Sequence, residues 1–246
     1  MASSSYSLYT LVYVVHYSIR RIPVNRESMT TAETARGQLS RDLIVETAVS
    51  IAEAGGLETV SMRSIAGALG VTAMSLYKHV ANKDALIGEM LDRVISEIEL
   101  PDGLDWKTAI RRSSISTREV LLRHRWAPGL WHVRVGGSGQ ARLRHADWML
   151  RMLRSGDVSE DLTYHAYHIL ESYILGSTLQ ELSFPYRGEE LTGIVEDFLA
   201  EFPVDEFPDM ATHVRQHLEP RRAVKSGFEF AIDLLLDGLE RARDAR

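Results

Sequence analysis

Apolar side chains recur along the chain at spacings of three and four residues, which is the pattern of helices with one buried face. Residues 40–54 show it first, and Gly55 and Gly56 follow. Further helices are predicted at residues 105–124, 138–154, 159–183 and 222–244, with shorter ones near 126–133, 188–201 and 208–218. Convincing period-two alternation does not occur after residue 28. The predicted fold class is therefore all-α.

The segment SMRSIAGALGVTAMSLYKHVANKDAL, residues 61–86, predicts two short helices in close succession and the start of a third. Ser61 is expected to cap the first helix, and Gly70 is expected to end it in the left-handed conformation. Thr72 is expected to cap a very short second helix, and Asn82 the third. A helix, a tight turn and a short helix form the motif that places its second helix in the major groove of DNA.

The predicted helices divide into two parts that follow a leader. Residues 1–39 are a leader or flexible arm, residues 40–88 a three-helix module, and residues 89–246 a larger helical domain. The leader is apolar and then basic, which is the reverse of a secretory signal, and the apolar run is too short for a membrane span of roughly 20 residues. We expect a start site placed too far upstream, with Met29 as the working initiator, or a disordered leader; a reversed signal anchor is the alternative.

Composition and charge limit where a nucleic-acid surface can lie. The 246 residues carry a formal net charge of -6, so any DNA-binding surface must be local. The chain has 0 Cys, which excludes disulfides and thiolate metal sites and fits the cytoplasm. No phosphate loop, GxSxG motif or di-iron ligand set is found. We therefore expect a protein that is not an enzyme.

The helices at residues 159–183 and 222–244 are apolar around more than one face. A helix of this kind needs two packing partners. One face can meet the same subunit and the other a second copy, which predicts a homodimer built on these two helices. The alternative is a central core helix in a monomer.

The order of these segments resembles the tetracycline-repressor family of bacterial regulators. The resemblance is most specific in TVSMRSIAGALGVTAMSLYKHVANKDALI, and weaker in LLRHRWAPGLWHV, ILGSTLQE and FEFAIDLLLDGLE of the C-terminal part. It implies a homodimer with a helix-turn-helix on each subunit, a small-molecule cavity in each C-terminal body, and ligand binding that changes the separation of the two DNA-reading heads. Repression rather than activation is the family-level expectation.

Positions that face outward from the helix-turn-helix are candidates for contact with double-stranded operator DNA. Lys78 is expected to donate to guanine, whereas Tyr77, His79 and Lys83 are placed to reach phosphates. The alternative for each is a solvated surface side chain. The full set of expected DNA-binding residues is Arg63, Thr72, Ala73, Met74, Ser75, Tyr77, Lys78, His79 and Lys83. Two subunits would read a palindromic operator, with an affinity that falls steeply with salt.

Polar aromatic residues in the C-terminal part suggest an effector pocket. His165, His168 and Ser172 share one helical face and are expected to line a cavity between helices. The alternative is that such rings pack in the core with satisfied hydrogen bonds. The candidate pocket residues are Trp131, His132, His165, His168, Ser172 and Gln180.

The tetracycline-repressor branch implies a drug–magnesium chelate bound by a His and an acid. His132 stands near the position of that His, but Gln180 occupies the position of the acid. The histidine pairs at residues 165/168 and 213/217 have helical ligand spacing but lack the HExxH glutamate. We therefore expect no metal and no cofactor, and an uncharged or weakly polar effector, aromatic or polyketide-like.

Two further alternatives concern function. The rival hypothesis is a DNA-binding regulator that is controlled by a protein partner, or an activator without a small-molecule inducer. A C-terminal body filled by its own side chains would favour this hypothesis.

Residues 189–209 carry an excess of acidic side chains. They are interpreted as a solvated face with a Pro-broken loop, or alternatively as a mobile cover over the pocket.

Overall fold

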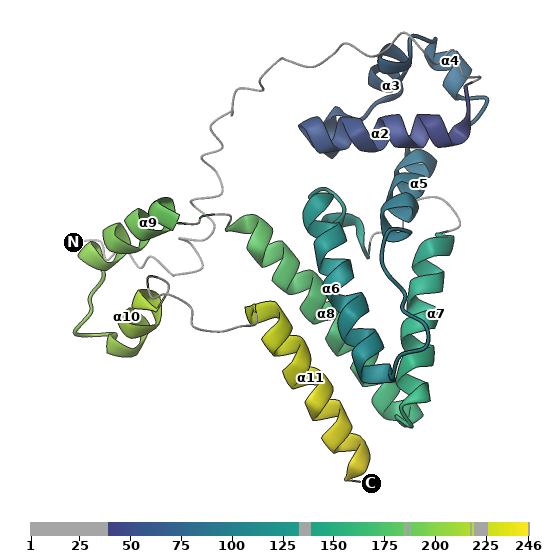
Figure 1. Ribbon diagram of the computed structural model, residues 1–246. Coiled ribbons are helices and arrows are strands. Elements are labelled where there is room, and N and C mark those ends of the chain that lie inside the picture. Colours follow the sequence, from purple (N-terminus) through teal and green to yellow (C-terminus); the bar gives the residue numbers. More distant parts are fainter. Residues whose placement is uncertain are drawn as a thin grey trace. The chain divides into compact units, whose positions relative to one another are not determined.

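The computed structural model describes residues 39–132, 139–184, 186, 188–216, 218 and 226–245. This described part holds ten α-helices and no strand, which confirms the all-α prediction (Figure 1). The predictions about the leader and about His217 fall outside the described residues.

Three helices form the N-terminal head: α2 (Arg41–Gly55), α3 (Met62–Leu69) and α4 (Ala73–Leu76). The Ser61 hydroxyl caps α3 by accepting from the backbone N–H of Ser64, and the Ser64 hydroxyl in turn accepts from the backbone N–H of Ser61. Gly70 ends α3 with a φ of 65°, a left-handed conformation in which a β-carbon is strained. The local cap signals in the sequence were therefore sufficient to set both ends of this helix.

The second helix of the motif is shorter than predicted. It ends at Leu76, and residues 77–79 form a turn in which the His79 N–H donates to the Leu76 carbonyl at 2.9 Å. Thr72 occupies the N-cap position, but its hydroxyl bonds the Ser75 hydroxyl at 2.8 Å and makes no cap bond to the backbone. The predicted extent to about His79 and the predicted Thr72 cap were thus wrong in detail, because a tighter i+3 bond and a local side-chain bond form instead.

Helix α5 (Lys83–Ile95) connects the head to the rest of the chain. The Asn82 side chain accepts from the Ala85 N–H at 2.8 Å, as predicted for a cap. This helix packs against α2, and farther along against α6 and α7. The predicted boundary at residue 88 falls within α5, and the division into two domains there stays a prediction.

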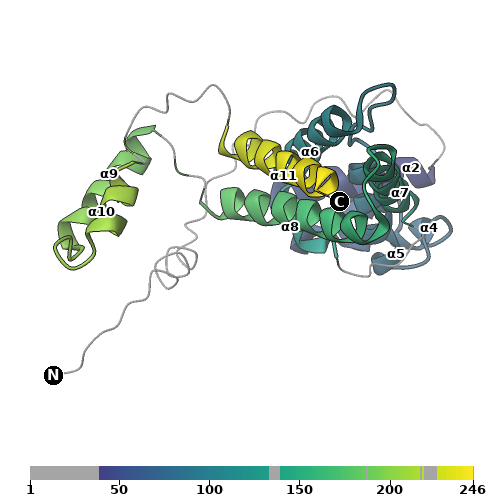
Figure 2. The same ribbon diagram turned by 90° about the horizontal axis from the view of Figure 1, so that it is seen from below.

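The C-terminal body is built on four long helices around a shared core. They are α6 (Trp106–Arg123), α7 (Gln140–Ser155), α8 (Glu160–Ser183) and α11 (Gly227–Asp244), with the short 3-10 helix η3 (Pro128–Leu130) after α6. Figure 2 shows α8 and α11 side by side, and the two helices are in contact. Helices α9 (Gly188–Glu201) and α10 (Pro208–Arg215) pack against each other. Trp148, Leu170 and Ile232 are among the fully buried side chains of the body core.

Candidate DNA-reading surface and effector cavity

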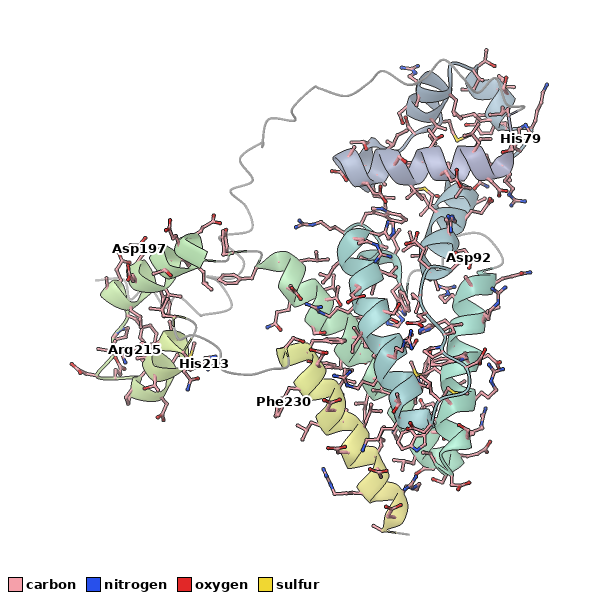
Figure 3. All side chains as sticks on the ribbon, viewed as in Figure 1. His79, Asp92, Asp197, His213, Arg215 and Phe230 are labelled. Carbon is pink, nitrogen blue, oxygen red and sulfur yellow. The ribbon has the colours of Figure 1, made fainter. Side chains whose placement is uncertain are left out.

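The residues predicted to contact DNA lie on α3, α4, the following turn and the first turn of α5. Met74 is 73% exposed and Tyr77 48% exposed, whereas the adjacent Leu76 and Val80 are buried. Arg63, Thr72, Lys78 and Lys83 are exposed, and Ala73, Ser75 and His79 are half-buried. Figure 3 labels His79 in the turn after α4. Two buried side chains, Leu76 and Val80, thus anchor a segment whose neighbouring side chains are exposed or half-buried.

A small cavity lies inside the body between α6, α7 and α8. Its volume is about 10 Å³, close to the least space that holds one water molecule. It is lined by Thr117, Trp131, His145, Met149, Tyr167, Glu171, Ile174 and Leu175. Side chains therefore fill most of this space, and a larger ligand has to displace some of them.

A hydrogen-bonded polar group occupies one wall of the cavity. Glu171 Oε1 accepts from the indole N–H of Trp131 at 2.9 Å and from the Tyr167 hydroxyl at 3.1 Å. The indole meets the His145 ring edge-on, with ring centroids 5.9 Å apart. On the α6 side, Thr117 Oγ1 lies 3.5 Å from His145 Nε2. Two neutral donors, from Trp131 and Tyr167, therefore converge on one carboxylate oxygen, and the His145 ring packs against the first of them.

Burial sets the protonation of two of these groups. Desolvation lowers the pKa of His145 to about 4, against the opposing effect of the Glu171 charge, so the imidazole is neutral near pH 7. Desolvation and the Glu171 charge raise the pKa of Tyr167 above its ordinary value, so its hydroxyl remains a donor.

The sequence-predicted pocket residues and the observed cavity share Trp131 only. His132, His165, His168, Ser172 and Gln180 are exposed and do not line this cavity. The cavity face predicted for residues 165, 168 and 172 does not hold within the single chain, because α8 turns Tyr167, Glu171 and Ile174 inward instead. The spacing of four residues between Tyr167 and Glu171 could have predicted that these two side chains meet on one face of a helix. The local sequence around His145 and Thr117 contains no comparable pattern.

One side chain of α5 ties that helix to the cavity wall. Asp92 Oδ1 accepts from the backbone N–H groups of Ala141 at 2.8 Å and Arg142 at 3.4 Å, and so caps α7 from another helix (Figure 3). Gly139, at the N-cap position of α7, has no side chain for this purpose. Arg142 in turn donates to the backbone carbonyl of Trp131 at 3.2 Å. A continuous set of contacts thus runs from the cavity to the helix that begins at Lys83.

A buried histidine joins the head to the body at a second point. His124, just after α6, places Nδ1 2.9 Å from Glu53 of α2 and Nε2 3.2 Å from Glu97. Arg123 also contacts Glu97, at 2.9 Å. Burial alone would raise the pKa of Glu97, but the hydrogen bonds from Arg123 and His124 outweigh it and lower that pKa. The carboxylates of Glu53 and Glu97, which come from different parts of the chain, therefore both contact the His124 imidazole.

The outward faces of α8 and α11 carry large apolar side chains. Phe230 and Leu234 of α11 are 64% and 56% exposed, and Ile169 and Leu179 of α8 are also exposed. A β-carbon added at Gly176 would meet nothing within 4 Å. These two helices therefore have both a buried and an exposed apolar face, which is what their sequences predicted.

None of the helices described combines the length and apolarity of a membrane span. No group of three or more His, Cys, Asp or Glu side chains in the described ranges is arranged to hold a metal ion.

Two family models match the chain and together cover nearly all of the helical part. Residues 44–90 match the model described as bacterial regulatory proteins, tetR family, and residues 99–243 match the tetracyclin repressor-like C-terminal domain. The chain therefore belongs to the TetR family. Its members are DNA-binding transcriptional regulators, typically repressors with a ligand-binding C-terminal domain.

Individual relatives agree with this assignment. The chain is 30% identical over 218 residues to the HTH-type transcriptional repressor DrrR1 of Streptomyces coeruleorubidus, covering 82% of this chain and 77% of that protein. It is similar to ActR of Streptomyces coelicolor in complex with actinorhodin, with 26% identity, a TM-score of 0.67, and coverage of 84% of this chain and 99% of that chain. SCO7222, a TetR from the same organism, shares the fold at 22% identity, with a TM-score of 0.72 and coverage of 83% and 99%.

Proposed function

We propose that the protein is a cytoplasmic, homodimeric transcriptional repressor that binds a palindromic operator and is released from it by a small molecule. The observation that carries this proposal is the set of contacts from the Glu171–Trp131 hydrogen bond through Arg142 and Asp92 to α5. The helix that bears Lys83 is thereby linked to the cavity in the body.

The head supplies the DNA-binding half of the function. In this proposal Lys78 donates to guanine, and Tyr77, His79 and Lys83 hold phosphates. Arg63, Thr72 and Ser75 add further polar contacts, and Ala73 and Met74 pack on thymine methyl groups. Because the exposed cations of the motif carry the phosphate contacts, affinity is expected to fall steeply with salt.

The exposed apolar face of α8 and α11 supports the homodimer. This face carries four large apolar side chains, those of Phe230, Leu234, Ile169 and Leu179. Gly176 on the same face allows a close approach of a second backbone. An apolar surface of this kind is favourable to bury against a second copy. Two heads held by one dimer would then match the two half-sites of a palindrome.

The small-molecule effector is supported by the hydrogen-bonded Glu171 at the cavity and by a relative. ActR, similar over 84% of this chain, is bound to actinorhodin. In this protein, a ligand that separates Trp131 from Glu171 would move the Trp131 backbone, which Arg142 holds. The N-terminus of α7 and Asp92 would follow, and with them α5 and the spacing of the heads.

A second candidate function is a regulator that answers to a protein partner, or an activator without an inducer. The observation in its favour is the cavity volume of about 10 Å³, since side chains fill the body. The half-buried, hydrogen-bonded carboxylate of Glu171 favours the small-molecule proposal, because a few polar groups that converge on an apolar pocket are typical of ligand sites.

The test is fluorescence anisotropy of the full chain on labelled intergenic DNA beside its own gene, titrated with salt. Tight binding at one palindrome, weakened by Tyr77→Ala and by Lys83→Ala, is the expected result. Arg144→Ala, an exposed basic residue on α7, is the matched control and should bind like the wild type. Weak, sequence-independent binding by the wild type would contradict the proposal.

A further inference from the structure

We infer that the effector is a flat aromatic molecule that carries a protonated amine, and that its amine displaces the Trp131 indole from Glu171. This inference rests on the proposed function and adds the chemical class of the ligand.

Glu171 is the acidic residue of the cavity with which a cationic ligand would pair. Its Oε1 accepts two hydrogen bonds, and both donors, the Trp131 indole and the Tyr167 hydroxyl, are neutral. Among the residues that line the cavity there is no Lys or Arg. The guanidinium of Arg142, close by, is directed to the Trp131 backbone carbonyl at 3.2 Å. The cavity wall thus carries one carboxylate without a cationic partner among its lining residues, and a cation bound there would be stabilised.

The Trp131 side chain occupies the place of such a ligand. It is an aromatic ring, 3% exposed, whose N–H donates to the carboxylate at 2.9 Å and whose edge meets His145. A molecule that opens the cavity has to replace both the ring contact and the donated hydrogen bond. A neutral donor would only equal the indole, whereas a hydrogen bond from a cation is roughly twice as strong. Positive charge therefore decides the competition in favour of the ligand.

The rest of the wall suits a flat ring. The His145 and Tyr167 rings offer aromatic faces or edges, and Met149 has a flexible thioether that adapts to an added ring. Ile174 and Leu175 complete the apolar lining. The uncharged effector expected from the sequence relied on Gln180 at the position of an acid. Gln180 is exposed, and Glu171 is the carboxylate that reaches the cavity.

Three probes of the same three-ring shape separate charge from shape in a calorimetric titration of the full chain at pH 8 without DNA. They are 9-aminoacridine, a cation; acridine, which is neutral; and anthracene-9-carboxylate, an anion. The cation is expected to bind about tenfold more tightly than acridine, in keeping with a charge-assisted hydrogen bond. Glu171→Gln should remove this preference, and Glu196→Gln, the same change at an exposed site on α9, should retain it.

The variant Trp131→Phe tests the displacement itself. It keeps an aromatic ring and removes the competing N–H, so the cation should bind several-fold more tightly than to the wild type. Equal affinities for the cation and acridine, no binding of the cation, a preference that survives Glu171→Gln, or weaker binding to Trp131→Phe would each overturn the inference. Operator binding by the unliganded wild type and Glu171→Gln proteins is measured in parallel, so that a failure of the ligand class is distinguished from a failure of the regulator proposal.

Discussion

The head and the cavity differ in where their functional side chains lie and in what holds them there. In the head, Tyr77 and Lys78 are exposed beside the buried Leu76, and they follow one another in the sequence. In the cavity, Glu171 and His145 are held among buried side chains and come from different helices. A local motif can therefore present a reading surface, whereas a cavity depends on how distant segments pack. Substitutions in the head and in the cavity are therefore expected to differ in their effects on stability, operator binding and ligand release.

Leu76→Ala is expected to have the largest effect on stability. Leu76 is fully buried, and truncation of such a side chain costs about 2–5 kcal/mol. Chemical denaturation should show this loss together with loss of operator binding. Tyr77→Ala, one residue on, is expected to change the free energy of unfolding by no more than about 0.5 kcal/mol while still weakening operator binding. Equal destabilisation by both variants would contradict the division into anchor and reading residues.

The buried His145 predicts a pH dependence of stability that comes from the cavity. Its pKa in the folded protein is about 4, below the ordinary value of 6.5, so the unfolded chain binds more protons between these values. Stability is therefore fully present above about pH 6.5 and falls as the pH decreases towards 4, by at most about 3 kcal/mol.

The measurement is urea denaturation of the wild type and His145→Gln between pH 4 and 7. The wild type should lose more stability over this range than the variant does. Parallel pH profiles for the two proteins would show that His145 is not the group responsible.

Asp92→Ala tests the connection between the two regions. Loss of its bonds to the α7 backbone should lower the free energy of unfolding by about 1–2 kcal/mol, as for a helix cap. Operator affinity without ligand should be nearly unchanged, but release by 9-aminoacridine in the anisotropy assay should be weaker. Asp147→Ala, an exposed change on α7, is the control. Full release from the Asp92→Ala protein would argue against this route of coupling.

Ser61→Ala and Thr72→Ala have the smallest expected effects and contrast two cap positions within the head. Ser61 bonds the α3 backbone, so its removal should cost about 1 kcal/mol. Thr72 makes no cap bond to α4, so its loss should cost no more than about 0.5 kcal/mol. Thermal unfolding compares them directly. A larger cost for Thr72→Ala would contradict the observed side-chain geometry.

The sequence by itself determined the helical elements and the head. Ser61, Gly70 and Asn82 act on backbone groups within a few residues of themselves, so their effect could be predicted without knowledge of the packing. The family resemblance rested on the same local segment. The end of α4 was predicted less well, because the His79 N–H bonds the Leu76 carbonyl and the Thr72 hydroxyl bonds the Ser75 hydroxyl, and local bonds of this kind compete with a longer helix.

Only the tertiary structure decided the cavity. Helix α8 is apolar on both faces, so its sequence did not indicate which side would turn inward, and the choice of Glu171 over His165 and His168 was made by packing against α6 and α7. Likewise, Asp92 caps a helix that begins some 50 residues later in the chain. Contacts of this kind leave no periodic or cap signal in the local sequence, because each partner satisfies its hydrogen-bonding groups only after distant helices have come together.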